Sequence, residues 1–81
     1  MSLTDTDEAH IAGEELRFRM TDGARRVVVR ISQDALDDVQ ARSGVTGFEA
    51  HRAAFAALAT RKYAKGDREA DGSIIVRPRD I

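Results

Sequence analysis

The stretch LRFRMTDGARRVVVRISQDALDDV, residues 16–39, decides the fold because its apolar spacing changes partway along. Before Ser32, apolar and polar residues alternate, which is the pattern of a strand with one buried face. From Ser32 onward, apolar residues recur at three- and four-residue steps, which indicates an amphipathic helix. This change of period predicts an α+β fold in which strands and helices share one core.

Two strands are expected before Ser32, joined by a hairpin. The first covers residues 14–20, and the second, residues 24–31, is rich in β-branched side chains. Between them lies Asp22-Gly23, a dipeptide typical of tight hairpin turns because both residues tolerate a positive φ. We therefore expect the two strands to pair in an antiparallel arrangement.

Two helices are expected next. Ser32 can cap the first helix at its start, and Gly44 suits the left-handed position just after its end. Thr46 and Glu49 match the capping box that opens many helices. A second, longer helix is therefore predicted from this point to Gly66.

A final strand is predicted over residues 73–77, ending before Pro78, and residues 67–70 leave room for one further short strand. The element order is then β-β-α-α-β. We expect a small antiparallel sheet with two helices packed on one face. The predicted core consists of Leu16, Phe18, Val27, Val29, Ile31, Leu36, Val39, Phe48, Phe55, Leu58, Ile74 and Val76.

The chain begins with a polar, acidic segment. Residues 1–13 lack apolar periodicity and are predicted to form a disordered tail, which leaves residues 14–81 as a single α+β domain. The first 15 residues carry five acidic groups and no basic group, whereas the rest of the chain has 13 basic residues against nine acidic ones. The folded body is therefore expected to be basic, although the whole chain has a net charge of −1.

Composition bears on the cellular compartment and the oligomeric state expected of the protein. Cysteine is absent, which fits a reducing cytoplasm, and no apolar run approaches the ~20 residues that a membrane span needs. Thirteen of the hydrophobic residues are alanines, so the core of this 81-residue chain is small. Small cores are often stabilised by a partner subunit, and we therefore expect a homodimer.

Arginines on the first hairpin are the main candidate for a binding site. Alternation places Arg17, Arg19, Arg26 and Arg30 on the side opposite the apolar row, where they could contact nucleic acid or another anion. The alternative is a solvated face that Glu15 and the acidic segment partly neutralise. Both interpretations remain open at this point.

Catalytic and metal-binding groups are few. His10 falls in the expected tail, and His51 is expected at the edge of the helical core face, so neither predicts a catalytic centre. Asp34, Asp37 and Asp38 share a helical face, but acidic residues are also favoured near a helix start by its dipole. We expect no metal, no cofactor and no enzymatic activity.

The second half of the chain carries a connected motif: Phe48-x3-Arg52, Ala59-x2-Lys62-Tyr63-x2-Gly66, Asp71-Gly72-x-Ile74-x-Val76 and Asp80. With the stretch FRMTDGARRVVVRISQDALDD before it, this pattern resembles the family of small bacterial proteins known as domain of unknown function 1488. The resemblance implies a small bacterial α+β protein with no assigned activity. Its motif positions, whose roles it leaves open, are Arg52, Lys62, Tyr63, Gly66, Asp71, Gly72 and Asp80.

Two functions follow as expectations. The first is a non-enzymatic bacterial accessory or protein-interaction module in the cytoplasm. The alternative is a DNA-binding protein similar to ribbon-helix-helix proteins, because residues 25–58 read as strand, helix, turn and helix. In that architecture the strand pairs between two subunits, and here the arginine face of the hairpin would contact DNA.

Overall fold

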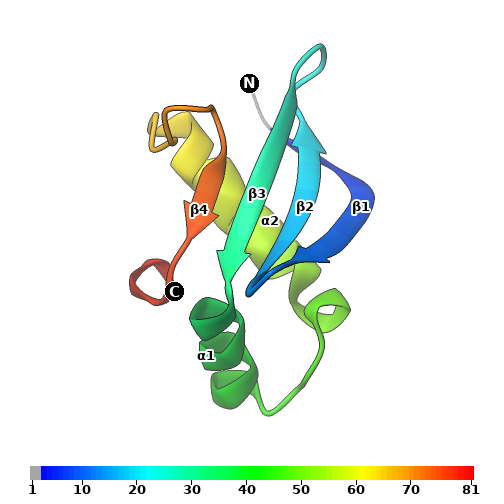
Figure 1. The fold of residues 1–81 in the computed structure, drawn as a ribbon, viewed down its shortest axis with the longest axis vertical. Helices are drawn as coiled ribbons and strands as arrows, with labels where there is room; N and C mark the ends of the chain where they lie inside the picture. The colour runs from blue at the N-terminus through cyan, green and yellow to red at the C-terminus, as the bar shows by residue number, and fades with distance from the viewer. Residues whose placement is uncertain (1–2) are drawn as a thin grey trace.

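The structure is a computed structural model that describes residues 3–81 and, for Asp7 and Ala12, the backbone only. It confirms the predicted α+β class, with four strands and two helices (Figure 1). The elements in chain order are β1 (Thr4–Ala12), β2 (Glu15–Thr21), β3 (Arg26–Ser32), α1 (Gln33–Ser43), α2 (Phe48–Ala64), β4 (Ile74–Val76) and a short 3-10 helix η1 (Pro78–Asp80).

The strands form one mixed sheet in the order β1-β2-β3-β4. The predicted hairpin is confirmed, since β2 and β3 are antiparallel and Phe18 lies opposite Val29. The prediction of a wholly antiparallel sheet needs one correction, because β4 runs parallel to β3, with Ile31 opposite Val76. Both helices intervene, and α2 carries the chain back along the sheet, so β4 starts from the same end as β3 (Figure 1).

The expected disordered tail is also corrected. Residues 4–12 form the edge strand β1, which pairs with β2 through contacts such as Asp5 opposite Met20 and Ile11 opposite Leu16. The domain therefore includes β1 rather than starting at residue 14. The first two residues of the expected tail lie outside the described part of the chain.

The core lies between the sheet and α2, which crosses one face (Figure 1). Eight of the predicted core residues are buried, and Leu16, Leu36, Val39 and Leu58 are partly buried around them. The predicted core lacks four further buried apolar residues, which are Leu3, Met20, Ala35 and Ala59.

Local signals at the helix ends are mostly confirmed. The Ser32 hydroxyl accepts a hydrogen bond from the Ala35 N–H at 3.1 Å, and Gly44 ends α1 with φ at 72°. The capping box expected at Thr46 is wrong, since α2 begins after Gly47, which has φ at 100° and no side-chain cap. A positive φ there is accessible to glycine, which lets the chain turn sharply between the helices.

Candidate functional site

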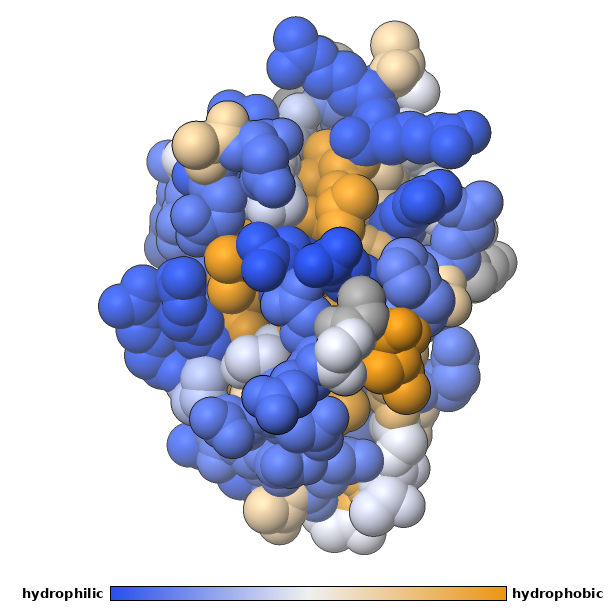
Figure 2. Space-filling model, in the orientation of Figure 1, coloured by the Kyte–Doolittle hydropathy of each residue, from blue (hydrophilic) through white to orange (hydrophobic). Residues whose placement is uncertain are grey.

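The face of the sheet opposite α2 is largely hydrophilic, with separate hydrophobic patches between the polar side chains (Figure 2). All four predicted arginines lie on this face. In the register of β2 and β3, Arg17 lies opposite Arg30, Arg19 opposite Val28, and Arg26 opposite Thr21. This surface of β2 and β3 is the arginine face.

Acidic side chains neutralise part of the arginine face. One carboxylate oxygen of Glu15 accepts hydrogen bonds from Arg17 Nε at 2.7 Å and Arg30 Nε at 2.9 Å. The bond from Arg30 is the main reason that the pKa of Glu15 lies below its ordinary value, although desolvation opposes the change. Glu8 on β1 lies 3.4 Å from Arg19. Among the described residues, Arg26 has no carboxylate partner within ion-pair distance.

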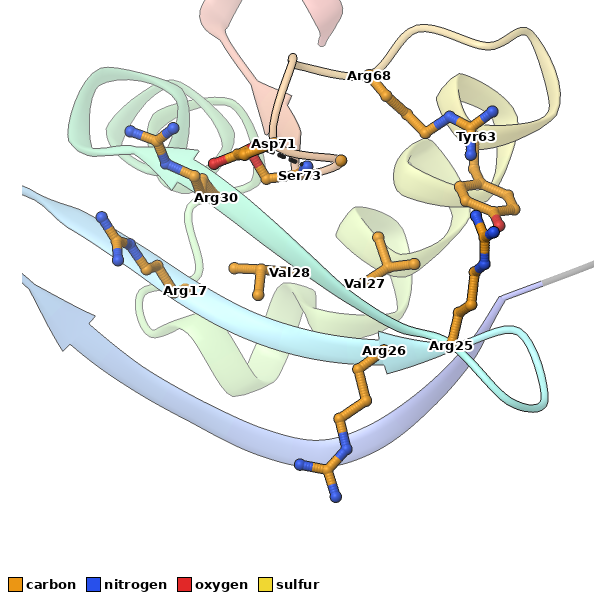
Figure 3. Close-up of a pocket in the computed structure, with 11 residues that line it drawn as sticks. Arg17, Arg25, Arg26, Val27, Val28, Arg30, Tyr63, Arg68, Asp71 and Ser73 are labelled. Carbon is orange, nitrogen blue, oxygen red and sulfur yellow. Dashed lines mark hydrogen bonds between the residues drawn. The ribbon is translucent and has the colours of Figure 1, made fainter.

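A groove of about 480 Å³ adjoins this face, between β3 and the loop that joins α2 to β4 (Figure 3). Its volume falls in the range of small ligand sites. Five arginines contribute to its walls, against one carboxylate, that of Asp71. The lining residues are Arg17, Arg25, Arg26, Val27, Val28, Arg30, Tyr63, Arg68, Asp71, Gly72 and Ser73. We call this hollow the arginine groove.

Two of these arginines were missed by the sequence analysis. Arg25 lies just before β3, and Arg68 lies in the loop after α2. The guanidinium of Arg68 stacks 4.6 Å from the centre of the Tyr63 ring. No local pattern could have placed Arg68 beside β3, because the long connection through both helices brings it there.

Tyr63 links the two walls of the arginine groove. Its hydroxyl donates a hydrogen bond to the Asp22 carboxylate in the β2–β3 hairpin. That bond raises the pKa of Tyr63 above its ordinary value, while the charges of Arg68 and Arg25 act in the opposite direction. The end of α2 is therefore tied to the hairpin next to the groove.

The carboxylate of Asp71 is already engaged within its own turn. It accepts hydrogen bonds from the Ser73 hydroxyl at 2.6 Å and the Ser73 N–H at 2.9 Å. These bonds lower the pKa of Asp71, so the group is ionised at neutral pH. Gly72, with φ at 87°, allows the tight turn between the two residues.

One half of β3 is open along the groove. Strand β4 pairs only with Val29 to Ile31, so residues 26–28 have no neighbouring strand on that side within the described part of the chain. Val27 and Val28 line the groove at this free half of β3. Backbone groups at such an edge are available to another extended chain.

Arg52, a motif position, joins α2 to β1. Its guanidinium makes a two-pronged contact with the Asp5 carboxylate, including Nη2 to Oδ1 at 2.8 Å, and lies 3.0 Å from a Glu49 oxygen. It also covers the rings of Phe18 and Phe48, at 5.7 and 5.3 Å from their centres. Hydrogen bonding to Asp5 raises the pKa of Arg52 above its ordinary value, which is already high. Arg52 therefore has a structural role, since it attaches β1 to α2.

Lys62 and Asp80 join α2 to the 3-10 helix η1. The largely buried Lys62 ammonium lies 3.0 Å from the Asp80 carboxylate and 3.1 Å from that of Asp67. Burial alone would raise the pKa of Asp80, but the Arg77 N–H and the Lys62 ammonium together lower it. Gly66, with φ at 76°, turns the chain out of α2 toward Asp67.

His51 closes the loop between α1 and α2. Its Nε2 lies 2.7 Å from the Val45 carbonyl oxygen, which can only accept, so Nε2 carries the proton and donates it. The Ser43 hydroxyl lies 3.2 Å from the same nitrogen. His10, expected in a disordered tail, instead lies on β1 opposite Arg17 and is exposed.

The three aspartates of α1 are involved in local contacts. Gln33 donates a hydrogen bond to Asp37 at 2.9 Å, and Arg42 lies 3.4 Å from Asp38. Asp34 lies in the first turn of the helix. Over residues 3–81, no group of three or more His, Cys, Asp or Glu side chains is placed to hold a metal ion. Neither helix there has the length and apolar character needed to span a bilayer.

Comparison with known families gives one match. A family model described as "Protein of unknown function (DUF1488)" matches residues 4–76, which include all four strands and both helices. No curated protein and no solved structure matches the chain. The arginine groove is therefore the feature of this chain that points to a function.

Proposed function

This chain belongs to the DUF1488 family of proteins of unknown function, and we propose that it is a non-enzymatic binding module whose arginine groove takes an acidic segment of a partner protein. The match over residues 4–76 also means that the edge strand β1 belongs to the family pattern. The proposal rests on the groove itself, because the family description assigns no activity.

The charge imbalance of the groove carries the proposal. Five arginines line it, and its one acidic residue, Asp71, is engaged by Ser73. Arg25, Arg26 and Arg68 have no carboxylate within ion-pair distance among the described residues. Guanidinium groups present planar forks of donors that match carboxylates, so an acidic segment suits this surface.

The side chains of the groove support binding rather than catalysis. Arginine stays protonated at physiological pH and is a poor general acid or base. The Tyr63 hydroxyl is occupied by Asp22, and the Ser73 hydroxyl by Asp71. The lining contains no histidine to activate a nucleophile.

DNA binding is a second candidate, favoured by the arginine face itself. Arg17, Arg19 and Arg30 lie together on two paired strands, as in a two-stranded ribbon that contacts DNA. Glu15 and Glu8 reduce the positive charge of that row. The ribbon-helix-helix arrangement is not present, because β3 lies between β2 and β4 of its own chain rather than pairing with a second subunit.

A binding assay with matched variants tests the proposal. We expect a fluorescein-labelled glutamate-rich peptide to bind at 20 mM salt and to be released as salt is raised, because salt screens ion pairs. Arg26→Ala with Arg68→Ala should weaken binding about tenfold or more. The control, Arg61→Ala with Arg79→Ala, removes the same charge from exposed positions outside the groove and should change little. Equal loss in both double variants would reduce the effect to net charge and refute a specific site.

The homodimer and the cytoplasmic location remain predictions. The homodimer expected from the small core would give a light-scattering mass of about twice 8.9 kDa. A mass of one chain at micromolar concentration would contradict it. The cytoplasmic location rests on composition and is checked by fractionating cells that express the tagged protein.

A further inference from the structure

We infer that the acidic segment binds as an added β-strand along the free half of β3, residues 26–28, with its carboxylates on the arginine face. This inference rests on the proposed function and specifies how the partner binds. The occupant is an extended segment of another protein, in which acidic residues alternate with apolar ones.

The path of the chain before β4 creates the place for such a strand. β4 starts at Ile74, opposite Val29, whereas β3 extends to Arg26. The Asp71–Ser73 turn leads the preceding chain away from the sheet, and the groove occupies the space beside Val27 and Val28 (Figure 3). Three strand residues span roughly 10 Å, so the added pairing is short.

The two sides of the added strand would meet different surroundings. Residues whose side chains point to the open face would lie next to Arg26 and Val28, and Arg30 follows on the same face where β4 begins, opposite Ile75. The alternate residues would point to the core side, where Val27 is buried. This alternation follows from the two-residue period of strands and selects acidic residues on one side and apolar ones on the other.

Charge argues against a second copy of this chain as the occupant. Two copies joined through this edge would bring Arg25, Arg26 and Arg68 of one close to the same residues of the other. Like charges at a strand edge oppose pairing, and proteins use basic edge residues in this way to prevent self-association. An acidic partner does not meet this repulsion, because its charges are opposite in sign to those of the arginines.

The placement of the aromatic residues argues against single-stranded nucleic acid. Proteins that bind single strands usually stack the bases on exposed aromatic rings. The three phenylalanines are buried, and Arg68 lies over the Tyr63 ring. A free strand edge, by contrast, offers N–H and C=O groups that a peptide backbone can pair with.

The test uses three synthetic peptides and one DNA duplex. The reference probe is a labelled, end-capped peptide of three Glu-Val repeats. Its two variants carry N-methyl groups either on every glutamate or on every valine nitrogen, which removes the N–H groups along one edge of the strand. Because only one edge of an added strand faces β3, we expect one variant to lose at least about fivefold in affinity and the other to bind almost as well as the reference.

A second readout comes from the protein itself. Binding of the reference peptide should slow amide hydrogen exchange within residues 26–28, while amides of α1 remain unchanged. Equal affinity of both N-methyl variants, with no slowing at residues 26–28, would overturn strand addition but leave acidic-peptide binding in place. Failure of all three peptides to bind at 20 mM salt would reject the proposed function as well. Tight binding of the mixed-sequence duplex alone would replace both proposals with the DNA-binding candidate.

Discussion

The Tyr63 hydroxyl, near the end of α2, donates a hydrogen bond to the Asp22 carboxylate in the β2–β3 hairpin, 41 residues earlier in the chain. The same Tyr63 ring supports the guanidinium of Arg68. One side chain thus connects the hairpin to the loop on the other side of the arginine groove. We expect the shape of the groove to depend on this connection, although Tyr63 itself has no charge to offer a ligand.

Removal of the hydroxyl should change how stability depends on pH. The pKa of Tyr63 is raised in the folded protein, mainly by the bond to Asp22. The stabilisation is therefore complete below the ordinary pKa of about 10 and is lost as pH rises through the higher folded value. Urea unfolding of the native protein and Tyr63→Phe at pH 8 to 11.5 measures it. We expect the stability difference between them to shrink with rising pH, and a constant difference would contradict this role.

Replacement of Arg52 should loosen β1. Arg52→Ala removes charged hydrogen bonds to Asp5 and the cover over Phe18 and Phe48, so we expect a loss of ~1.5–3 kcal/mol in the free energy of unfolding. Amide exchange in β1 should accelerate more than in β3. As control, Arg42→Ala breaks a more exposed pair with Asp38 and should cost less than ~0.5 kcal/mol. Unchanged exchange in β1 would show that Arg52 does not hold this strand.

Elements with local signals were predicted well from the sequence. The β-branched run of β3, the Ser32 cap and Gly44 together located a strand followed by a helix, and each signal lies within the element that it marks. The Asp22-Gly23 turn was equally local, and the Asp22 N–H indeed donates to the Arg25 carbonyl across the hairpin. The arginine face followed from alternation alone, because the period of a strand fixes which residues share a face.

Features that depend on distant contacts were missed. Strand β1 has little apolar periodicity, and its Asp5 is bound by Arg52, 47 residues away, so its local sequence resembles a disordered segment. The parallel direction of β4 depends on how the two helices cross the sheet, which no short pattern specifies. The same crossing places Arg68 in the groove, and this explains why the predicted site held only part of the basic cluster.

Acid should weaken the ion pair between Lys62 on α2 and Asp80 in η1. The pKa of Asp80 is lowered in the folded protein, because the Arg77 N–H and the Lys62 ammonium outweigh the opposing effect of burial. Its contribution is thus present above the ordinary pKa of about 3.9 and is lost as pH falls through the lower folded value. Urea unfolding of Asp80→Asn and the native protein should differ most at pH 7, and the difference should shrink as pH falls below the ordinary pKa of the carboxyl. Asp67→Asn, which alters the more exposed partner of Lys62, is the control and should have the smaller effect at pH 7. A difference that stays constant as pH falls through the acidic range would point to lost packing rather than lost charge.

Neutralising Glu15 should strengthen the binding of acidic peptides. Its carboxylate bonds both Arg17 and Arg30, so it competes with a ligand for two of the five arginines of the groove. Glu15→Gln keeps an oxygen that can accept these hydrogen bonds but removes the charge. We expect a two- to fivefold gain in affinity for the Glu-Val peptide at 20 mM salt, from screened interactions of ~0.5–1 kcal/mol, and almost no gain at 0.5 M salt. Asp37→Asn makes the same change in net charge on the exposed surface of α1, and it separates the local effect from the overall one. If both variants gain equally, the arginine face does not contribute as a site, because a ligand that contacts Arg17 and Arg30 must respond to the acid that they share.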